Sequence, residues 1–271
     1  TPSNFYHPTF ISNIDTIITP FQEEDFEAWR PEILLTFGGM IVSKRVKAWL
    51  RKYPPQEHWH VDKLRAYDTF GALTDHAEEE PNVFFHKLIQ HNNNRTESNY
   101  RQIAQVLSAY RKIKHAAYLA KNHFSDFKAF DSLLPALPDD SKLQISNSSA
   151  IRYAQLFENK AEVEVFCNRG TSGIDGSTST AIGAAVGSGK ETVLITGDIG
   201  FFYDSNALWN NYIPKNFKII LVNNRGGGIF RILPGHNETP VFNTFFETTH
   251  NLTAEHLAKM YGFKYQTAFN E

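Results

Sequence analysis

Residues 192–230 constrain the fold of this chain more than any other stretch. Two short apolar runs, 192–196 and 217–222, each end in polar residues and glycines. Short β-branched runs bounded in this way are typical of buried parallel strands. The segment between them predicts a helix that is N-capped by Asp204 or Ser205. The stretch therefore predicts one β-α-β unit, and open α/β sheets bind ligands at the carboxyl ends of their strands.

Oxygen-bearing side chains follow both predicted strands. Gly197-Asp198 follows the first strand, and Asn223-Asn224 follows the second, with a triple glycine after Arg225. A carboxylate, an amide oxygen and a glycine carbonyl form a ligand set that suits magnesium. Gly-Asp followed by Asn-Asn after about 25 residues resembles the thiamine diphosphate signature, with Ile199 in place of its usual second glycine. The alternative interpretation is two ordinary strand-ending turns.

Length, charge and cysteine content limit the class of protein. A chain of 271 residues can form two α/β domains of ordinary size. Its net charge of −2 and pI of about 6.6 indicate no polyanionic partner, and no nucleic-acid-binding face emerges. The single cysteine, Cys167, fits a reducing compartment and is interpreted as a core residue. No run of 18 apolar residues and no secretory signal occurs, so a cytoplasmic location without a membrane span is expected.

The first half of the chain predicts a second β-α-β unit. Residues 33–37 form a predicted buried strand, Ser43 caps a predicted helix to residue 52, and residues 58–62 form the next strand. His58 and His60 alternate on that strand, and without a third ligand we interpret them as a satisfied or exposed pair. A long amphipathic helix over 99–122 is expected to bridge two domains, 1–123 and 124–271.

The second half alternates predicted strands and helices in the same way. Helices are expected at 127–134, 150–157, 177–187 and 253–261, and further strands at 143–146 and 163–167. Residues 184–191 resemble a phosphate-binding loop but follow a helix and precede a strand, so they are interpreted as a helix C-cap. The predicted fold class is α/β, with two Rossmann-like domains and mostly parallel sheets. Because the chain lacks an initial Met and stops before the sheet would be complete, we expect truncation at both ends.

A longer motif carries a more specific resemblance. The string Asn168-Arg169-Gly170 through Asp175-Gly176 occurs together with the signature described above, Gly-Asp followed by Asn-Asn and glycines. Asn147-Ser148 with Arg152, and Ser43-Lys44-Arg45 followed by Trp49, extend it upstream. Together these motifs resemble the SEPHCHC synthase (MenD) family of menaquinone biosynthesis, over nearly the whole chain. The resemblance implies the thiamine-diphosphate-binding fold, with a middle domain and most of a diphosphate-binding domain.

The resemblance implies an enzyme that joins decarboxylated 2-oxoglutarate to isochorismate by a 1,4-addition. It implies thiamine diphosphate and Mg²⁺ or Mn²⁺ as cofactors, and a homodimer or homotetramer for the full-length enzyme. In this family a glutamate of the pyrimidine-binding domain contacts the cofactor, and that domain is absent from this sequence. The chain alone is therefore expected to be inactive and to contain no catalytic residue of its own.

The resemblance also assigns roles to individual residues. Asp198, Asn224 and the Gly226 carbonyl would hold the metal, and Gly197 and Ile174 would contact the cofactor. The residues that would meet substrate carboxylates are Lys44, Arg45, Ser148, Arg152 and Arg169, with Ile229, Phe230 and Leu233 as an apolar wall. Arginine forks match carboxylates bidentately, which agrees with two anionic substrates. On local sequence alone, Lys44 and Arg45 are more typical of solvated surface charges.

Two other classes of function remain open from the sequence. The first is another thiamine-diphosphate-dependent lyase, such as an acetolactate-synthase-like protein, which would explain the metal motif but not the carboxylate-binding residues. The second is a non-catalytic oligomerisation or binding module that has kept the fold.

Overall fold

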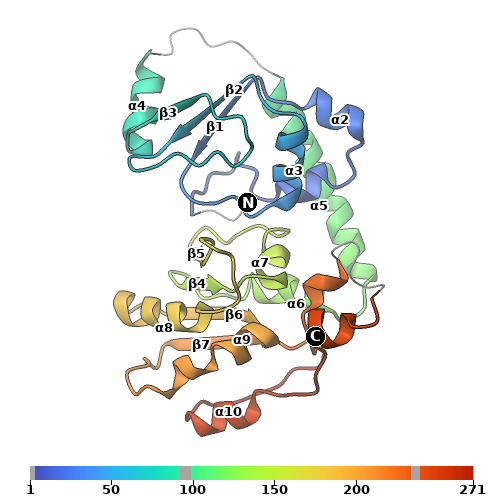
Figure 1. The fold of residues 1–271 in the computed structure, drawn as a ribbon, viewed down its shortest axis with the longest axis vertical. Helices are drawn as coiled ribbons and strands as arrows, with labels where there is room; N and C mark the ends of the chain where they lie inside the picture. Colours follow the sequence, from blue (N-terminus) through green and yellow to red (C-terminus); the bar gives the residue numbers. More distant parts are fainter. Residues whose placement is uncertain (1–3, 92–98, 233–238, 271) are drawn as a thin grey trace. The chain divides into compact units, whose positions relative to one another are not determined.

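A computed structural model describes residues 4–91, 99–232 and 239–270. The chain forms two compact units: residues 9–120 make up the first, and residues 121–270 with residues 4–8 make up the second. Each unit contains one parallel sheet with helices (Figure 1). The predicted α/β class with parallel sheets is therefore confirmed.

The first unit has a three-stranded sheet in the order β1-β2-β3. Its strands are β1 (Ile33–Phe37), β2 (Glu57–Val61) and β3 (Asp75–Ala77), all parallel. Its helices are α1 (Ile14–Ile18), α2 (Glu23–Ala28), α3 (Lys44–Lys52), α4 (Pro81–His91) and α5 (Tyr100–Lys121). The sequence missed β3, whose three residues include two polar ones and give no apolar pattern.

Two details of the first unit test the sequence interpretation. The predicted cap of α3 is confirmed, because the Val46 amide donates to the Ser43 hydroxyl at 2.9 Å. The strand predicted at residues 33–37 is confirmed, but the prediction that it is buried is wrong, since Ile33 is 57% exposed and Phe37 is 38% exposed at the two ends of an edge strand.

The histidine pair on β2 is buried and hydrogen-bonded. The Thr36 hydroxyl lies 2.8 Å from His58 Nε2 and 2.9 Å from His60 Nδ1. Burial lowers the pKa of both imidazoles, because it disfavours their charged form. The pair is therefore buried rather than exposed and only half satisfied, because His58 Nδ1 and His60 Nε2 have no hydrogen-bond partner among the described residues. Within the described ranges no three His, Cys, Asp or Glu side chains form a metal-binding group.

The second unit has a four-stranded parallel sheet in the order β5-β4-β6-β7 (Figure 1). The strands are β4 (Lys142–Ile145), β5 (Glu164–Cys167), β6 (Thr192–Gly197) and β7 (Phe217–Val222). The α-helices are α6 (Asp126–Leu133), α7 (Ser149–Ala154), α8 (Ser177–Ser188), α9 (Asp198–Tyr203) and α10 (Glu255–Met260). Three shorter helical segments are η1 (Ser205–Trp209), η2 (Gly228–Arg231) and η3 (Phe242–Phe246).

The central strand β6 forms the middle of this unit's core. Val193, Leu194 and Ile195 are at most 3% exposed, as expected for a strand covered on both faces. The small residues Ala181 and Ala185 of α8 are fully buried beside it. Because all four strands are parallel, their carboxyl ends share one edge, which carries the polar residues that follow each strand.

The helix after β6 begins earlier than the sequence predicts. It starts at Asp198, with Gly197 as N-cap, rather than at Asp204, and the segment from Ser205 is a separate 3₁₀ turn. The Asp204 carboxylate does not cap its own helix. It accepts hydrogen bonds from the amide (2.8 Å) and the hydroxyl (2.7 Å) of Ser179, in the first turn of α8.

Two further observations concern the helices. The predicted C-cap of α8 is confirmed, since Gly189 has a left-handed backbone (φ +64°) and its amide donates to the Ala185 carbonyl. Among the residues that the structure describes, no helix has the length and apolar character needed to cross a membrane.

Candidate functional site

A cavity of about 490 Å³ lies at the carboxyl edge of the sheet in the second unit. This volume is within the range of about 300–1,000 Å³ that is usual for small-molecule sites. The cavity is lined by residues that follow β4, β6 and β7 and by the loop after β5. The predicted site residues that line it are Ser148, Arg152, Arg169, Ile174, Gly197, Asp198, Asn224, Gly226, Ile229 and Phe230.

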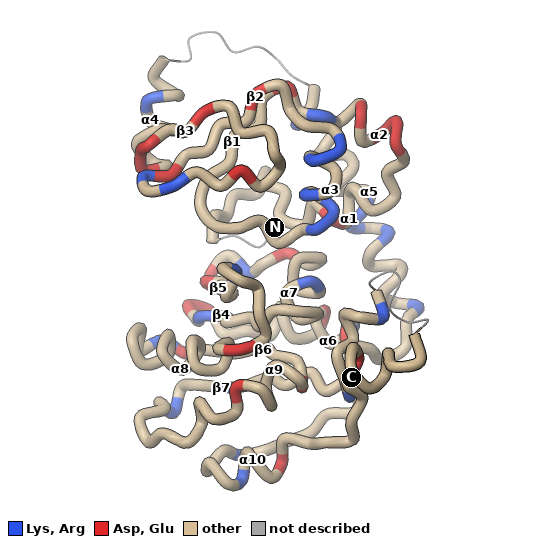
Figure 2. Tube along the Cα trace, in the orientation of Figure 1, with Lys and Arg blue, Asp and Glu red and all other residues tan. Residues whose placement is uncertain are grey.

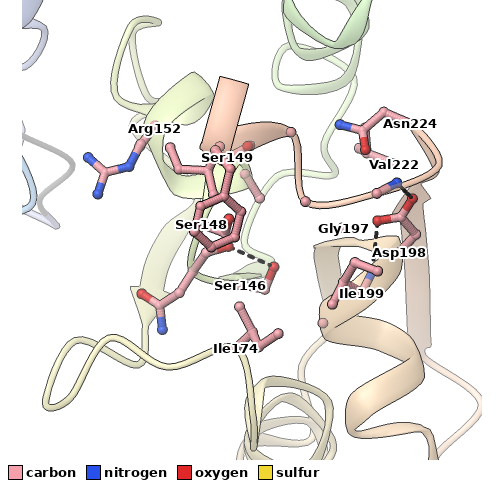
Figure 3. A pocket seen from close by; sticks show the side chains of 18 of the residues that line it. Ser146, Ser148, Ser149, Arg152, Ile174, Gly197, Asp198, Ile199, Val222 and Asn224 are labelled. Atoms are coloured by element: carbon pink, nitrogen blue, oxygen red, sulfur yellow. Dashed lines mark hydrogen bonds between the residues drawn. The ribbon is translucent and has the colours of Figure 1, made fainter. Parts of the chain in front are cut away.

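The predicted residues lie on different sides of this cavity (Figure 3). Asp198 and Asn224 lie on one side, and Arg152 lies on the opposite side, with Ser148 and Ser149 between them. Ile174 points up into the intervening space from the loop below.

Asp198 connects the end of β6 to the glycine loop after β7. The residue is 2% exposed, so it has little contact with solvent. Its Oδ1 atom accepts from the Ile199 amide at 2.7 Å, and its Oδ2 atom accepts from the Gly226 amide at 3.0 Å. Burial raises the pKa of this carboxyl group, and the hydrogen bonds from backbone amides oppose that shift.

His250 lies beside the same carboxylate. Its Nδ1 atom accepts from the Leu252 amide at 3.1 Å, so the neutral ring carries its proton on Nε2. That Nε2 atom lies 3.3 Å from Oδ2 of Asp198. The sequence analysis missed His250, because a lone histidine in a loop carries no local pattern.

Asn224 is oriented by a residue from a distant helix. Its Nδ2 atom donates to Oδ2 of Asp126 at 2.8 Å. Asp126 is the first residue of α6 and also lines the cavity. Because the amide nitrogen is held in this way, the amide oxygen remains available to a ligand. The sequence analysis missed Asp126 as well.

The glycines after Asn224 are needed for a close backbone approach. Gly226 has φ +155°, and a Cβ atom there would lie 2.8 Å from the Glu247 carbonyl oxygen. The Gly227 amide donates to that same carbonyl at 2.6 Å. A Cβ atom on Gly228 would lie 2.9 Å from Nδ2 of Asn224. Side chains at these positions would displace the loop that carries Asn224.

Left-handed backbone conformations are concentrated around the cavity. Ser148 (φ +70°), Ser172 (+61°) and Thr248 (+48°) line it, and Arg225 (+65°) precedes Gly226. Of the described non-glycine residues, Asp140 is the only other one with a positive φ. Such conformations cost about 1–3 kcal/mol each and persist where the surrounding structure holds them, which is typical of functional sites.

Arg169 follows β5 and is partly held in place. Its Nη1 atom donates to Oδ1 of Asn147 at 2.6 Å. Its Nε atom is buried and has no hydrogen-bond partner among the described residues. The guanidinium group therefore retains donor capacity for an anionic ligand.

Three predicted site residues belong to parts of the chain that the structure does not place relative to this cavity. Lys44 and Arg45 are exposed at the start of α3, a helix with Lys and Arg at both ends (Figure 2). They belong to the first unit, so their contact with a substrate stays a prediction. Leu233 lies outside the described residues.

The residues present fit a divalent cation that carries a diphosphate. Asp198 and Asn224 provide the hard oxygen donors that Mg²⁺ and Mn²⁺ prefer. Gly226 is within hydrogen-bond distance of Asp198, so its backbone belongs to the same group of atoms. The cavity beside them has room for an organic cofactor.

Residues 148–271 match the family described as "Thiamine pyrophosphate enzyme, C-terminal TPP binding domain". This match, the parallel sheet and the cavity at its carboxyl edge place the second unit among the C-terminal domains of thiamine pyrophosphate enzymes.

Curated relatives extend the similarity to almost the whole chain. It is 66% identical, over 99% of its length and 49% of the relative, to the "2-succinyl-5-enolpyruvyl-6-hydroxy-3-cyclohexene-1-carboxylate synthase" of Flavobacterium psychrophilum. Proteins of the same name from Flavobacterium johnsoniae and Christiangramia forsetii are 65% and 50% identical, over 98% and 100% of the chain and 48% of each relative. The resemblance to the SEPHCHC synthase (MenD) family is confirmed. The chain spans about half the length of these relatives.

Proposed function

We propose that this chain forms part of a thiamine-diphosphate-dependent SEPHCHC synthase of menaquinone biosynthesis. The reaction would join decarboxylated 2-oxoglutarate to isochorismate by a 1,4-addition. The observation that carries this proposal is the single cavity lined by Asp198, Asn224 and Gly226 together with Arg152 and Arg169. Metal-binding oxygens and carboxylate-binding cations at one site suit a diphosphate cofactor and anionic substrates.

At the cofactor end, Asp198, Asn224 and the Gly226 carbonyl would hold Mg²⁺ or Mn²⁺ and through it the diphosphate. Gly197 would allow the backbone to approach, and Ile174 would support the cofactor from the loop below. When bound, thiamine diphosphate would supply the carbanion stabilisation that this reaction needs. The protein would bind and orient the reactants.

At the substrate end, Arg152 and Arg169 would bind carboxylates through charge-assisted hydrogen bonds. Ser148 would add a hydroxyl donor next to α7. Lys44 and Arg45 of the first unit would complete the anion site, and Ile229, Phe230 and Leu233 would form its apolar wall. Phe230 packs against Phe246 with ring centroids 6.0 Å apart, which gives this wall a fixed surface.

The remaining proposals concern the assembled enzyme. A pyrimidine-binding domain would supply the glutamate that contacts the cofactor, so this chain alone would have no synthase activity. The enzyme would be a cytoplasmic homodimer or homotetramer that acts on small molecules and not on nucleic acid. We propose residues 1–123 as its middle domain and residues 124–271 as its diphosphate-binding domain.

Calorimetric titration of thiamine diphosphate into the full-length protein that contains this chain, with and without Mg²⁺, tests the cofactor assignment. Binding is expected with Mg²⁺ and should be lost on chelation. A protein that ignores the cofactor under both conditions would be a non-catalytic module instead. The substrate assignment needs the full-length protein. Product from 2-oxoglutarate and isochorismate supports the proposal, whereas turnover of pyruvate alone would identify an acetolactate-synthase-like lyase.

A further inference from the structure

Asn147 is the central residue of a buried polar network at the cavity. It follows Ser146, the first residue after β4, and is 2% exposed. Its Nδ2 atom donates to the carbonyl oxygens of Asn168 and Gly173, both at 2.6 Å. Its Oδ1 atom accepts from Nη1 of Arg169 at 2.6 Å and from the Cys167 thiol at 3.5 Å. Both amide hydrogens and the amide oxygen therefore have partners.

These partners lead to the two ends of the proposed site. Arg169 is the proposed carboxylate ligand, whereas Gly173 directly precedes Ile174, the proposed support of the cofactor. We infer that Asn147 is a positioning residue that couples the substrate end of the cavity to its cofactor end. This inference deepens the proposed function and rests on it.

The loop that Asn147 holds, residues 168–176, has other attachments as well. The start of the loop is tied to its end and to α8, because Nδ2 of Asn168 donates to the Gly176 carbonyl at 3.2 Å and to the Thr180 hydroxyl at 2.9 Å. Between these anchors, Ser172 adopts a left-handed conformation (φ +61°). The bond from Asn147 to the Gly173 carbonyl therefore fixes the middle of the loop, immediately before Ile174.

An asparagine suits this position because an amide presents two donors and one acceptor from one planar group. An aspartate of the same size could still accept from Arg169, and more strongly because it is charged. It would, however, place a carboxylate against the two carbonyl oxygens. Alanine would remove all of these hydrogen bonds. Asn147→Asp thus keeps the contact with Arg169 and loses those with the loop carbonyls, whereas Asn147→Ala loses both.

This geometry predicts a different pattern for each variant. Arg169→Ala should raise the KM for an anionic substrate about ten- to a hundredfold and leave cofactor affinity unchanged. Asn147→Asp should show the reverse, with cofactor affinity about tenfold weaker and substrate KM changed much less. Asn147→Ala should affect both, and adding Arg169→Ala to it should raise KM by less than Arg169→Ala does alone.

Asn216 provides a matched control at the opposite edge of the same sheet. Its Nδ2 atom also donates to two backbone carbonyls, those of Gly189 and Lys190, both at 2.9 Å. It precedes β7 rather than following a strand, so it is distant from the carboxyl edge. Asn216→Asp should lower stability without changing cofactor affinity or substrate KM.

The experiment uses the full-length synthase that contains this chain. Thiamine diphosphate is titrated at saturating Mg²⁺, KM is measured for each substrate, and hydrogen exchange is followed in residues 168–176 without ligands. Both Asn147 variants should exchange faster in this loop, whereas Arg169→Ala and Asn216→Asp should not. Cofactor affinity in both Asn147 variants equal to that of Asn216→Asp would overturn the coupling.

Failure of the proposed function would look different from failure of this inference. A wild-type enzyme that does not bind thiamine diphosphate contradicts the proposed function, and the inference would fall with it even if the loop exchanged as expected. Normal cofactor binding with unchanged loop exchange in the Asn147 variants contradicts only the inference. If Asn147→Ala does not fold, the contrast between Asn147→Asp and Arg169→Ala decides the question.

Discussion

The substitution Asp126→Asn tests how the site orients its metal-binding amide. Nδ2 of Asn224 donates to Oδ2 of Asp126 at 2.8 Å. An ionised carboxylate only accepts hydrogen bonds, so it holds the nitrogen of Asn224 and turns the oxygen away from itself. An asparagine at position 126 can donate as well as accept. The Asn224 amide could then turn over and present its nitrogen, which cannot bind a cation.

Two independent magnitudes give the size of the expected effect. A hydrogen bond to a charged group contributes about 1.5–3 kcal/mol and a neutral one about 0.5–1.5 kcal/mol. The substitution therefore removes about 1–1.5 kcal/mol of the free energy that holds the Asn224 amide in one orientation. Substitution of a residue that orients a metal ligand typically weakens metal binding about 10- to 100-fold, or about 1.4–2.8 kcal/mol. These ranges meet near tenfold. We therefore expect about tenfold weaker Mg²⁺ binding in Asp126→Asn.

The assay is a calorimetric titration of Mg²⁺ into the enzyme at saturating thiamine diphosphate. Asp131→Asn is the matched control, because Asp131 is an exposed residue of the same helix α6 and its substitution removes the same charge. A thermal melt of each variant separates affinity from stability. Equal Mg²⁺ affinity in Asp126→Asn and Asp131→Asn would refute the orienting role.

Four further experiments have defined outcomes. Asp198→Ala should abolish Mg²⁺-dependent cofactor binding in the full-length enzyme with circular dichroism unchanged, and retained affinity would exclude Asp198 as a ligand. Asp204→Ala should lower the free energy of unfolding in urea by about 1.5–3 kcal/mol, more than loss of a simple helix cap, because its buried carboxylate accepts two hydrogen bonds from Ser179. Burial raises the pKa of the Cys167 thiol to about 11, which disfavours the reactive thiolate, so at pH 8 iodoacetamide should alkylate the folded chain about a hundredfold more slowly than the unfolded one. Comparable rates in the two states would show that the thiol is accessible and ionised. The purified chain alone should show no synthase activity with 2-oxoglutarate and isochorismate, and measurable turnover would contradict the need for a further domain.

The strands that build the site were predictable because their signals are local. Short β-branched runs that end in glycine or polar residues identified β6 and β7, and the sheet has the expected parallel order around them. Parallel strands place their carboxyl ends at one edge, so the neighbourhood of Asp198 and Asn224 followed from the strands alone.

The start of α9 was not predictable in the same way. The sequence predicted a helix only from Asp204 or Ser205, and Gly200 disfavours an earlier start by its intrinsic propensity. In the structure a Cβ atom on Gly200 would lie 3.4 Å from the Thr196 hydroxyl and 3.6 Å from the Ile174 carbonyl. These are ordinary contact distances, so the packing does not require a glycine here. The helix forms despite Gly200, packed against β6, β7 and the loop below the cavity. Tertiary packing outweighed local propensity, and only the folded chain shows it.

The residues that orient the site could not be predicted from the sequence either, for a related reason. Asp126 and Asn224 are 98 positions apart, and Asn147 meets Arg169 across 22 positions. Each contact joins the end of one strand to another segment, so neither partner carries a recognisable spacing. A short motif can identify a residue that binds a ligand. The residue that orients this side chain is brought to it only by the fold, so it has no sequence spacing that could be recognised.

The contacts at this edge have a consequence for binding. Asp198 is held by two backbone amides, Asn224 by Asp126, and Arg169 by Asn147. Several residues around them adopt costly left-handed conformations that such contacts maintain. Side chains already fixed before a ligand arrives lose less conformational entropy when it binds, so more of the interaction energy remains as affinity. The side chains of the site are thus ordered when the second unit folds, before a ligand binds. Substitutions that remove a hydrogen-bond partner of a ligand-binding side chain should therefore lower affinity more than substitutions in the core.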